Sequence, residues 1–258
     1  MSRPKIPEKI KREVRKRCGF GCVICGLPIY EYDHIIEYSK TKRHLAKELT
    51  LLCPLCHSAK TKGHIPVEDV IKANENPYNL SSGTSTPYLI RFSGQEPEIH
   101  FGGLKFICTH GSKPKYLYPI VIDKKPLFGF TVVDGGLLLN MEVRDESGRK
   151  VLKIRDSQLQ VSDCVWDATF VGKTLVLKEQ LRKSIVEVEF CPPSIFKIKR
   201  YKIASGDTVV EIKDSLIHFH GSDIPTVELV SDGTGTMDGN VGIAVGELPK
   251  GLGVCMAI

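Results

Sequence analysis

The sequence predicts an α+β protein in which a small metal-binding domain precedes a mainly-β domain, a sandwich or a barrel. Two Cys-x2-Cys pairs, Cys22 with Cys25 and Cys53 with Cys56, lie near the N-terminus, and this pattern is typical of a metal site. Residues 76–87 are polar and rich in turn-forming residues, which indicates a linker. Beyond them, short runs of β-branched residues alternate with turn signals, which favours an all-β arrangement.

These changes of pattern predict the domain organisation. We expect an N-terminal domain over residues 1–75, a linker over residues 76–87 and a mainly-β domain over residues 88–258. A chain of 258 residues is long enough for one large domain or two small ones.

The N-terminal elements are predicted from apolar spacing and from the residues that begin helices. Pro7 can begin a helix, and apolar residues follow it at helical spacing, so residues 7–17 should form a basic amphipathic helix. We expect a strand within residues 30–38, and a short helix that begins at the second cysteine pair and runs through Lys60. Residues 66–73 should form another helix.

The C-terminal strands are predicted from β-branched runs bounded by turn residues. The aromatic residues Trp166, Phe170, Phe190 and Phe196 are expected in the core rather than on a surface for stacking bases. Residues 232–253 are rich in glycine, and we expect them to be irregular. The predicted strands cover residues 117–122, 137–143, 151–154, 174–177, 185–190, 196–198 and 209–212.

The whole chain sets limits on cellular location. No run of apolar residues is long enough for a membrane helix, so no membrane partner is expected. The first residues lack the apolar core of a signal peptide, which predicts a cytoplasmic protein. In that reducing compartment, paired cysteines indicate metal ligands rather than disulfides.

The excess positive charge is concentrated at the N-terminus. Residues 1–75 contain 15 Lys and Arg against 9 Asp and Glu, whereas the remaining residues are balanced. Such a patch is typical of a protein that binds nucleic acid. The alternative is a solvated helix face that happens to be basic, and charge alone leaves both open.

The two cysteine pairs predict one structural zinc site. Four thiolates in two such pairs can surround a zinc ion tetrahedrally. The alternative, four unrelated buried cysteines, is disfavoured because both pairs have the same spacing and lie close together in the chain.

An ordered set of motifs surrounds these cysteines. Residues 7–64 resemble the HNH endonuclease family, in its four-cysteine zinc-ribbon subtype. The matching pieces, in order, are Cys22-x2-Cys25-Gly26, Tyr32-Asp33-His34-Ile35 and Leu49-Thr50-Leu51-Leu52-Cys53-x2-Cys56-His57-x2-Lys60.

The resemblance implies a ββα-metal fold and a nuclease that cleaves DNA, of the restriction, phage-defence or mobile-element kind. It implies that Asp33 and His57 bind a catalytic divalent ion such as Mg²⁺, Mn²⁺ or Ni²⁺, separate from the structural Zn²⁺. His34 would be the general base, and imidazole suits that task near neutral pH. Two other histidines, His44 and His64, are expected to be solvated rather than catalytic.

One position departs from the family pattern. Glu48 stands where the family has an asparagine that braces the loop between the two strands, and an ionised glutamate accepts hydrogen bonds but cannot donate them. Because of Glu48, the alternative is a catalytically decayed HNH protein that only binds nucleic acid.

Several basic side chains are candidates for phosphate contacts: Lys60, Arg43, Arg12 and Arg15. The β domain carries no motif that we can connect to a reaction. Target recognition, sensing of an effector and assembly into a homo-oligomer all stay open as its role.

Overall fold

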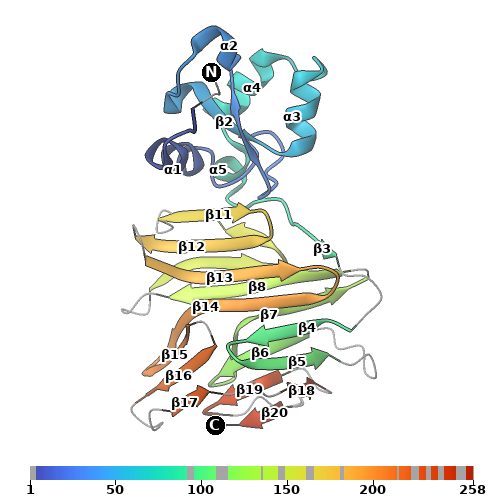
Figure 1. Cartoon of the computed structure of the whole chain (residues 1–258), viewed down its shortest axis with the longest axis vertical. Helices are drawn as coiled ribbons and strands as arrows, with labels where there is room; N and C mark the ends of the chain where they lie inside the picture. The colour runs from blue at the N-terminus through green and yellow to red at the C-terminus, as the bar shows by residue number, and fades with distance from the viewer. Residues whose placement is uncertain are drawn as a thin grey trace.

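The computed structural model has a small N-terminal part and a larger β part, arranged along the long axis of the molecule (Figure 1). Its two termini lie at opposite ends of this axis. The arrangement confirms the predicted α+β class, with helices gathered in the N-terminal part and sheets in the rest. The structure describes residues 4–91, 96–108, 116–134, 136–144, 149–160, 166–180, 183–213, 215–221, 227–230, 234–237, 241–247 and 254–257.

The N-terminal part surrounds one two-stranded antiparallel sheet. In this sheet Asp33 is paired with Thr50, and His34 is paired with Leu49. The second strand is buried at all four positions and therefore anchors the first. The elements are α1 (Glu8–Arg17), β1 (Glu31–His34), α2 (Tyr38–Thr41), the 3-10 helix η1 (Ala46–Glu48), β2 (Leu49–Leu52), α3 (Pro54–Thr61), α4 (Val67–Glu75) and α5 (Tyr78–Ser82).

Helix α1 packs on β2 because its apolar residues share one face. Val14 is fully buried, and Ile10 packs against the same cluster. This cluster also contains the cysteine side chains and the leucines of β2. Among the basic residues of α1, Arg17 donates to the carbonyl oxygens of Ala46 and Leu49 beside β2, whereas Arg15 faces the β part. No described helix has the length and apolar composition needed to cross a lipid bilayer.

Residues 76–87, which the sequence predicts as a linker, are packed against both parts. They include α5. Buried Asn79 donates a hydrogen bond to the carbonyl oxygen of Gly19 at 2.8 Å. Ser85 N–H donates to the carbonyl oxygen of Leu159 in the β part at 2.9 Å. The segment is therefore ordered by its contacts, and the domain boundary stays a prediction.

The β part consists of two sheets packed face to face, which matches the predicted sandwich (Figure 1). One sheet has the order β10-β9-β8-β7-β6-β19-β20, with β3 beside β8. The other has the order β11-β12-β13-β14-β15-β16-β17, extended by β4, β5 and β18. The strands are β3 (Ile90–Arg91), β4 (Glu98–Phe101), β5 (Leu104–Cys108), β6 (Tyr116–Ile122), β7 (Lys125–Val133), β8 (Gly136–Arg144), β9 (Lys150–Arg155), β10 (Gln158–Gln160), β11 (Asp167–Val171), β12 (Thr174–Gln180), β13 (Lys183–Cys191), β14 (Ile195–Ser205), β15 (Thr208–Lys213), β16 (Leu216–His220), β17 (Val227–Val230), β18 (Thr234–Met237), β19 (Val241–Val245) and β20 (Val254–Ala257).

The core of the sandwich contains most of the predicted aromatic residues. Phe190 and Phe196 are buried, and Phe170 packs against them while partly buried. Trp166 differs, because it lies at the junction with the N-terminal part.

The prediction that residues 232–253 are irregular is wrong for the described part of that range. It contains β18 and β19, and β19 is buried throughout. The remaining residues of the range lie outside the described residues.

Candidate active site and zinc centre

The predicted metal ligands Asp33 and His57 face each other across β1 and α3. His57 Nε2 lies 3.3 Å from Asp33 Oδ1. Lys60 Nζ contacts Asp33 Oδ2 and donates to the carbonyl oxygen of His34 at 2.5 Å. The carboxylate of Asp33 and the ammonium of Lys60 are largely buried, whereas the His57 side chain is 34% exposed. A carboxylate oxygen and an imidazole nitrogen therefore converge at an accessible position.

The opposite ring nitrogen of His57 is held by Glu31. His57 Nδ1 lies 2.6 Å from Glu31 Oε2. Glu31 precedes Asp33 by two positions on β1, and such residues lie on the same face of a strand. A carboxylate on one imidazole nitrogen directs the other nitrogen toward a metal. Glu31 is absent from the predicted site residues, although its period-two spacing from Asp33 is visible in the sequence.

His34, the predicted general base, lies against another histidine. His34 is 4% exposed as a residue, and its Nε2 lies 3.2 Å from His44 Nδ1. His44 Nε2 lies 2.9 Å from the carbonyl oxygen of Pro4. The ring of Tyr38 stacks on His44 and meets the His34 ring edge to face. His44, which we expected to be solvated, is thus half-buried and paired with His34.

The four predicted zinc ligands come together as one cluster. The sulfur atoms of Cys22, Cys25, Cys53 and Cys56 all lie within 4.8 Å of one another. Cys53 also accepts a hydrogen bond from the backbone N–H of Cys56 and so caps the start of α3. Cys53 thus belongs both to the cysteine cluster and to the N-cap of the helix that carries His57.

The ionisation of this cluster fits a bound cation. A hydrogen bond from the Cys25 side chain lowers the pKa of Cys22 to about 5. Burial, and then the negative charge of Cys22, raises the pKa of Cys56 to about 12. The hydrogen bond with Cys22, and then burial, raises the pKa of Cys25. Four thiolates so close together need a positive ion between them, and sulfur donors in this number suit zinc.

Glu48 lies at the end of the segment that connects β1 to β2, directly before β2. Arg43 Nε lies 3.1 Å from its Oε1 and 3.2 Å from its Oε2. These hydrogen bonds hold the pKa of the Glu48 carboxyl below its usual value. The backbone carbonyl of Glu48 accepts from Ile35 N–H at 3.0 Å. The loop after His34 is thus braced by the main chain of Glu48, while its side chain pairs with Arg43.

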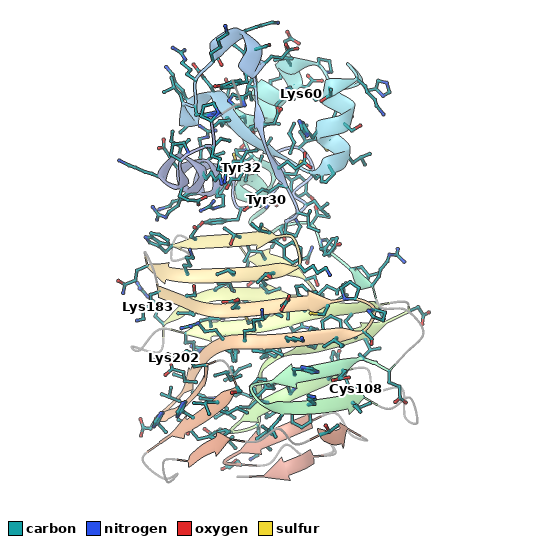
Figure 2. The ribbon with its side chains drawn as sticks, in the orientation of Figure 1. Tyr30, Tyr32, Lys60, Cys108, Lys183 and Lys202 are labelled. Atoms are coloured by element: carbon teal, nitrogen blue, oxygen red, sulfur yellow. The ribbon has the colours of Figure 1, made fainter. Side chains whose placement is uncertain are left out.

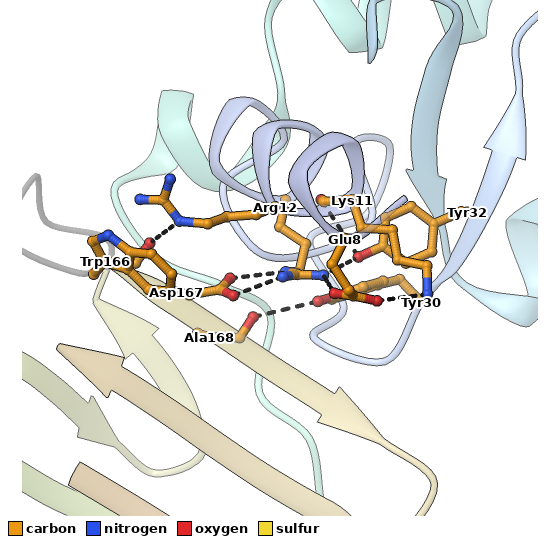
Figure 3. A network of polar contacts seen from close by, with 9 residues as sticks. Glu8, Lys11, Arg12, Tyr30, Tyr32, Trp166, Asp167 and Ala168 are labelled. Carbon is orange, nitrogen blue, oxygen red and sulfur yellow. Dashed lines mark hydrogen bonds and ion pairs between the residues drawn. The ribbon is translucent and has the colours of Figure 1, made fainter. Parts of the chain in front are cut away.

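Arg12 and Arg15, two of the predicted phosphate contacts, interact with the β part in this structure (Figure 3). Their contact with phosphate stays a prediction. Arg15 forms two parallel hydrogen bonds with Asp167, at 2.8 and 2.6 Å, and donates to the hydroxyl of Tyr32 at 2.5 Å. The guanidinium of Arg12 lies 3.8 Å from the ring centre of Trp166.

These contacts form a junction between α1, β1 and the start of β11. Burial disfavours the charged guanidinium of Arg15, but the hydrogen bonds and negative charge of Asp167, together with the interaction with Tyr32, outweigh this and raise its pKa. Tyr30 adds a hydrogen bond to the carbonyl oxygen of Ala168 at 3.4 Å. Figure 2 places Tyr30 and Tyr32 near this junction and Lys60 farther from it. A positive helix face alone could not indicate that a remote strand covers it.

The two remaining phosphate candidates differ in accessibility. The side chain of Arg43 is 60% exposed, whereas that of Lys60 is 10% exposed and occupied by Asp33. Of the four candidates, Arg43 is therefore the one whose side chain is open to solvent while lying beside the His34 loop.

The N-terminal part combines a four-cysteine cluster with Asp33, His34 and His57 on a strand and a helix, and it is joined to a β sandwich. Residues 17–63 match the family model described as HNH endonuclease. The matched range contains every cysteine of the cluster as well as Asp33, His34 and His57. This confirms the resemblance that the motifs predict and supports a function within the nuclease family. Comparisons with curated proteins and with solved structures gave no match.

Proposed function

We propose that the protein is a metal-dependent endonuclease that hydrolyses phosphodiester bonds of DNA. The observation that carries the proposal is the convergence of Asp33 and His57, 3.3 Å apart, on a strand and a helix fixed by the cysteine cluster. His34 follows Asp33 directly, so a base and two metal ligands come from one short stretch of the fold.

Asp33 and His57 would hold a catalytic divalent ion such as Mg²⁺, Mn²⁺ or Ni²⁺. The donor set fits such an ion, because Asp33 Oδ1 and His57 Nε2 converge and Glu31 keeps the His57 ring turned toward Asp33. A divalent ion there supplies positive charge where the phosphate becomes more negative in the transition state. Lys60 already faces the other oxygen of Asp33 and holds that carboxylate in place.

His34 would take the proton from the attacking water. The water oxygen bonds to phosphorus while one bridging P–O bond breaks, and the electron pair of that bond goes to the leaving oxygen. The proton resides on the His34 ring until solvent removes it. Asp33 and Lys60 would bind and orient, whereas His34 would contribute by proton transfer, typically worth about 10²–10⁴-fold in rate.

The substrate surface would lie on the N-terminal part, where the excess positive charge resides. Arg43 is exposed beside the loop that follows His34, which suits contact with a phosphate near the scissile bond. The contacts of Arg12 and Arg15 with the β part favour Arg43 over them as a phosphate contact. We propose a cytoplasmic location, on the ground that paired reduced cysteines serve as zinc ligands.

A second candidate is a nucleic-acid-binding protein that has lost catalysis. Glu48 favours it, because a carboxylate paired with Arg43 replaces the family's asparagine beside the loop. The two candidates differ in whether any divalent ion supports cleavage.

The test compares wild-type protein with His34→Ala in a plasmid-nicking assay with magnesium, manganese or nickel. We expect nicking by the wild type and loss of nicking by His34→Ala, with zinc content and DNA affinity unchanged. His64→Ala is the matched control, since His64 is exposed in the same part of the chain. A wild type inert with every ion and DNA form would favour the binding protein. A His34→Ala rate within about threefold of wild type would exclude His34 as the base, since a base contributes far more.

A further inference from the structure

His34 and His44 form a chain of hydrogen bonds that ends on a backbone carbonyl. His34 Nε2 lies 3.2 Å from His44 Nδ1, and His44 Nε2 lies 2.9 Å from the carbonyl oxygen of Pro4. A carbonyl oxygen only accepts hydrogen bonds, so the nitrogen that faces it must carry a proton. In the hydrogen bond between His44 and Pro4, His44 Nε2 is therefore the donor.

The donor at His44 Nε2 then determines the donor and acceptor in the hydrogen bond between the two rings. A neutral imidazole has one N–H donor and one acceptor nitrogen. With Nε2 of His44 donating to Pro4, its Nδ1 is the acceptor, so His34 Nε2 must be the donor. The proton of neutral His34 therefore lies on Nε2, and its lone pair lies on Nδ1.

Aromatic packing holds the second ring of the chain in place. Tyr38 stacks on His44 with ring centres 5.0 Å apart and planes 23° apart, and it meets His34 at 5.2 Å. Tyr38 lies on α2, which ends at Lys42 in a left-handed conformation, just before His44. The turn after α2 thus brings His44 back toward β1.

We propose that His44 is a positioning residue that fixes the tautomer and ring orientation of His34. For catalysis this rests on the proposed function, with His34 as the base: His44 then fixes which ring nitrogen of His34 has the lone pair that can accept a proton. A base in the other tautomer would present an N–H at that nitrogen and could not accept the proton.

The direct test is nitrogen-15 magnetic resonance of histidine rings in the full-length zinc-bound protein. Long-range proton–nitrogen correlations distinguish the protonated ring nitrogen from the one with the lone pair. Spectra at about pH 8, above the ordinary imidazole pKa of about 6.5, report neutral rings. The His34 signals are assigned by their absence from His34→Ala. We expect the proton of His34 on Nε2, and a wild type with that proton on Nδ1 would overturn the proposal.

Two substitutions of His44 distinguish the effect of its acceptor nitrogen from the effect of its aromatic ring. His44→Phe keeps an aromatic ring against Tyr38 but removes the acceptor, whereas His44→Asn places an amide oxygen near the position of Nδ1. In His44→Phe we expect a mixture of His34 tautomers and a single-turnover rate lower by about 10–100-fold, as for other residues that orient a catalytic group. DNA affinity and zinc content should not change. His44→Asn should keep the Nε2–H tautomer and recover most of the rate.

The outcomes distinguish this proposal from the proposed function. A His44→Phe variant that keeps both the Nε2–H tautomer and the wild-type rate would show that His44 does not position His34. If wild-type protein cleaves nothing while its spectrum shows the Nε2–H tautomer, the nuclease proposal fails and the hydrogen-bond chain stands. If His44→Phe does not fold, the wild-type spectrum and His44→Asn still decide the tautomer. His64→Phe, at an exposed position, is the control for substituting a histidine in this part of the chain.

Discussion

The ion pair between Arg15 and Asp167 should be one of the costliest contacts to break in this protein. The two side chains are 6% and 3% exposed, and both carboxylate oxygens accept from the guanidinium. In Asp167→Asn the shape is kept, but a buried cation loses its counter-charge. Removing one partner of such a pair typically costs about 3–5 kcal/mol. Because the pair joins α1 to β11, the loss of stability should first affect the junction between the two parts.

Urea unfolding followed by the fluorescence of Trp166 measures this cost. Trp166 is the single tryptophan of the chain and lies under the guanidinium of Arg12, so its emission reports the junction. With a slope of about 2–3 kcal/mol per molar urea, the midpoint should fall by about 1–2.5 M in Asp167→Asn. Circular dichroism in parallel shows whether the β part unfolds in the same transition.

An exposed ion pair and a double variant serve as controls for the cost of breaking the pair between Arg15 and Asp167. The pair of Asp69 and Lys72 on α4 is 3.8 Å long with both side chains mostly exposed, so Asp69→Asn should cost no more than about 1 kcal/mol. The double variant Arg15→Met with Asp167→Leu replaces both charges by apolar groups and should recover most of the stability. If Asp167→Asn costs no more than Asp69→Asn, the reasoning from burial is refuted.

Cys53→Ser should release zinc and unfold the N-terminal part while the β part keeps its circular dichroism, because the Cys53 sulfur both joins the cluster and caps α3; retention of zinc in elemental analysis would contradict this. Acid should act similarly: since the pKa of Cys22 is lowered from 9.0 to about 5, the stability that its thiolate contributes is complete above the unfolded pKa and lost as pH falls through about 5. Zinc content after dialysis across this range checks the direction, and zinc bound more tightly at acid pH would exclude it. Glu31→Ala should weaken the catalytic metal site by about 10–100-fold, read from the metal dependence of nicking, because His57 loses the acceptor for Nδ1; exposed Glu68 replaced by Ala is the control and should match wild type.

Features with a local pattern could be predicted from the sequence. The cysteine pairs needed only their spacing, and the structure brings all four sulfurs together. Helix α1 was predicted from Pro7 and the apolar spacing after it, and it begins at Glu8. The family pattern in the neighbouring motif residues predicts Asp33 and His57 as metal ligands. In the structure His57 Nε2 lies 3.3 Å from Asp33 Oδ1.

Features that depend on distant partners could not be predicted in the same way. Arg15 had the pattern of a solvent-facing helix residue, yet its partner Asp167 is 152 positions away. Nothing near His44 in the sequence indicates that the turn after α2 returns it to His34. The strand order of the sandwich is likewise long-range: β19 pairs in parallel with β6, and β4 pairs in parallel with β14. Short apolar runs predict that strands exist but do not specify their neighbours.

The origin of Asp167 in the β part limits how this nuclease-like domain can be recombined. Grafted onto another carrier, residues 4–91 would bring Arg15 without its counter-ion, together with Tyr30 lacking its carbonyl acceptor on Ala168. A new carrier would have to offer a carboxylate at the same position, or Arg15 would have to be exchanged for an apolar residue. Shuffling of this domain among proteins, in the laboratory or in evolution, should therefore leave paired changes at positions 15 and 167.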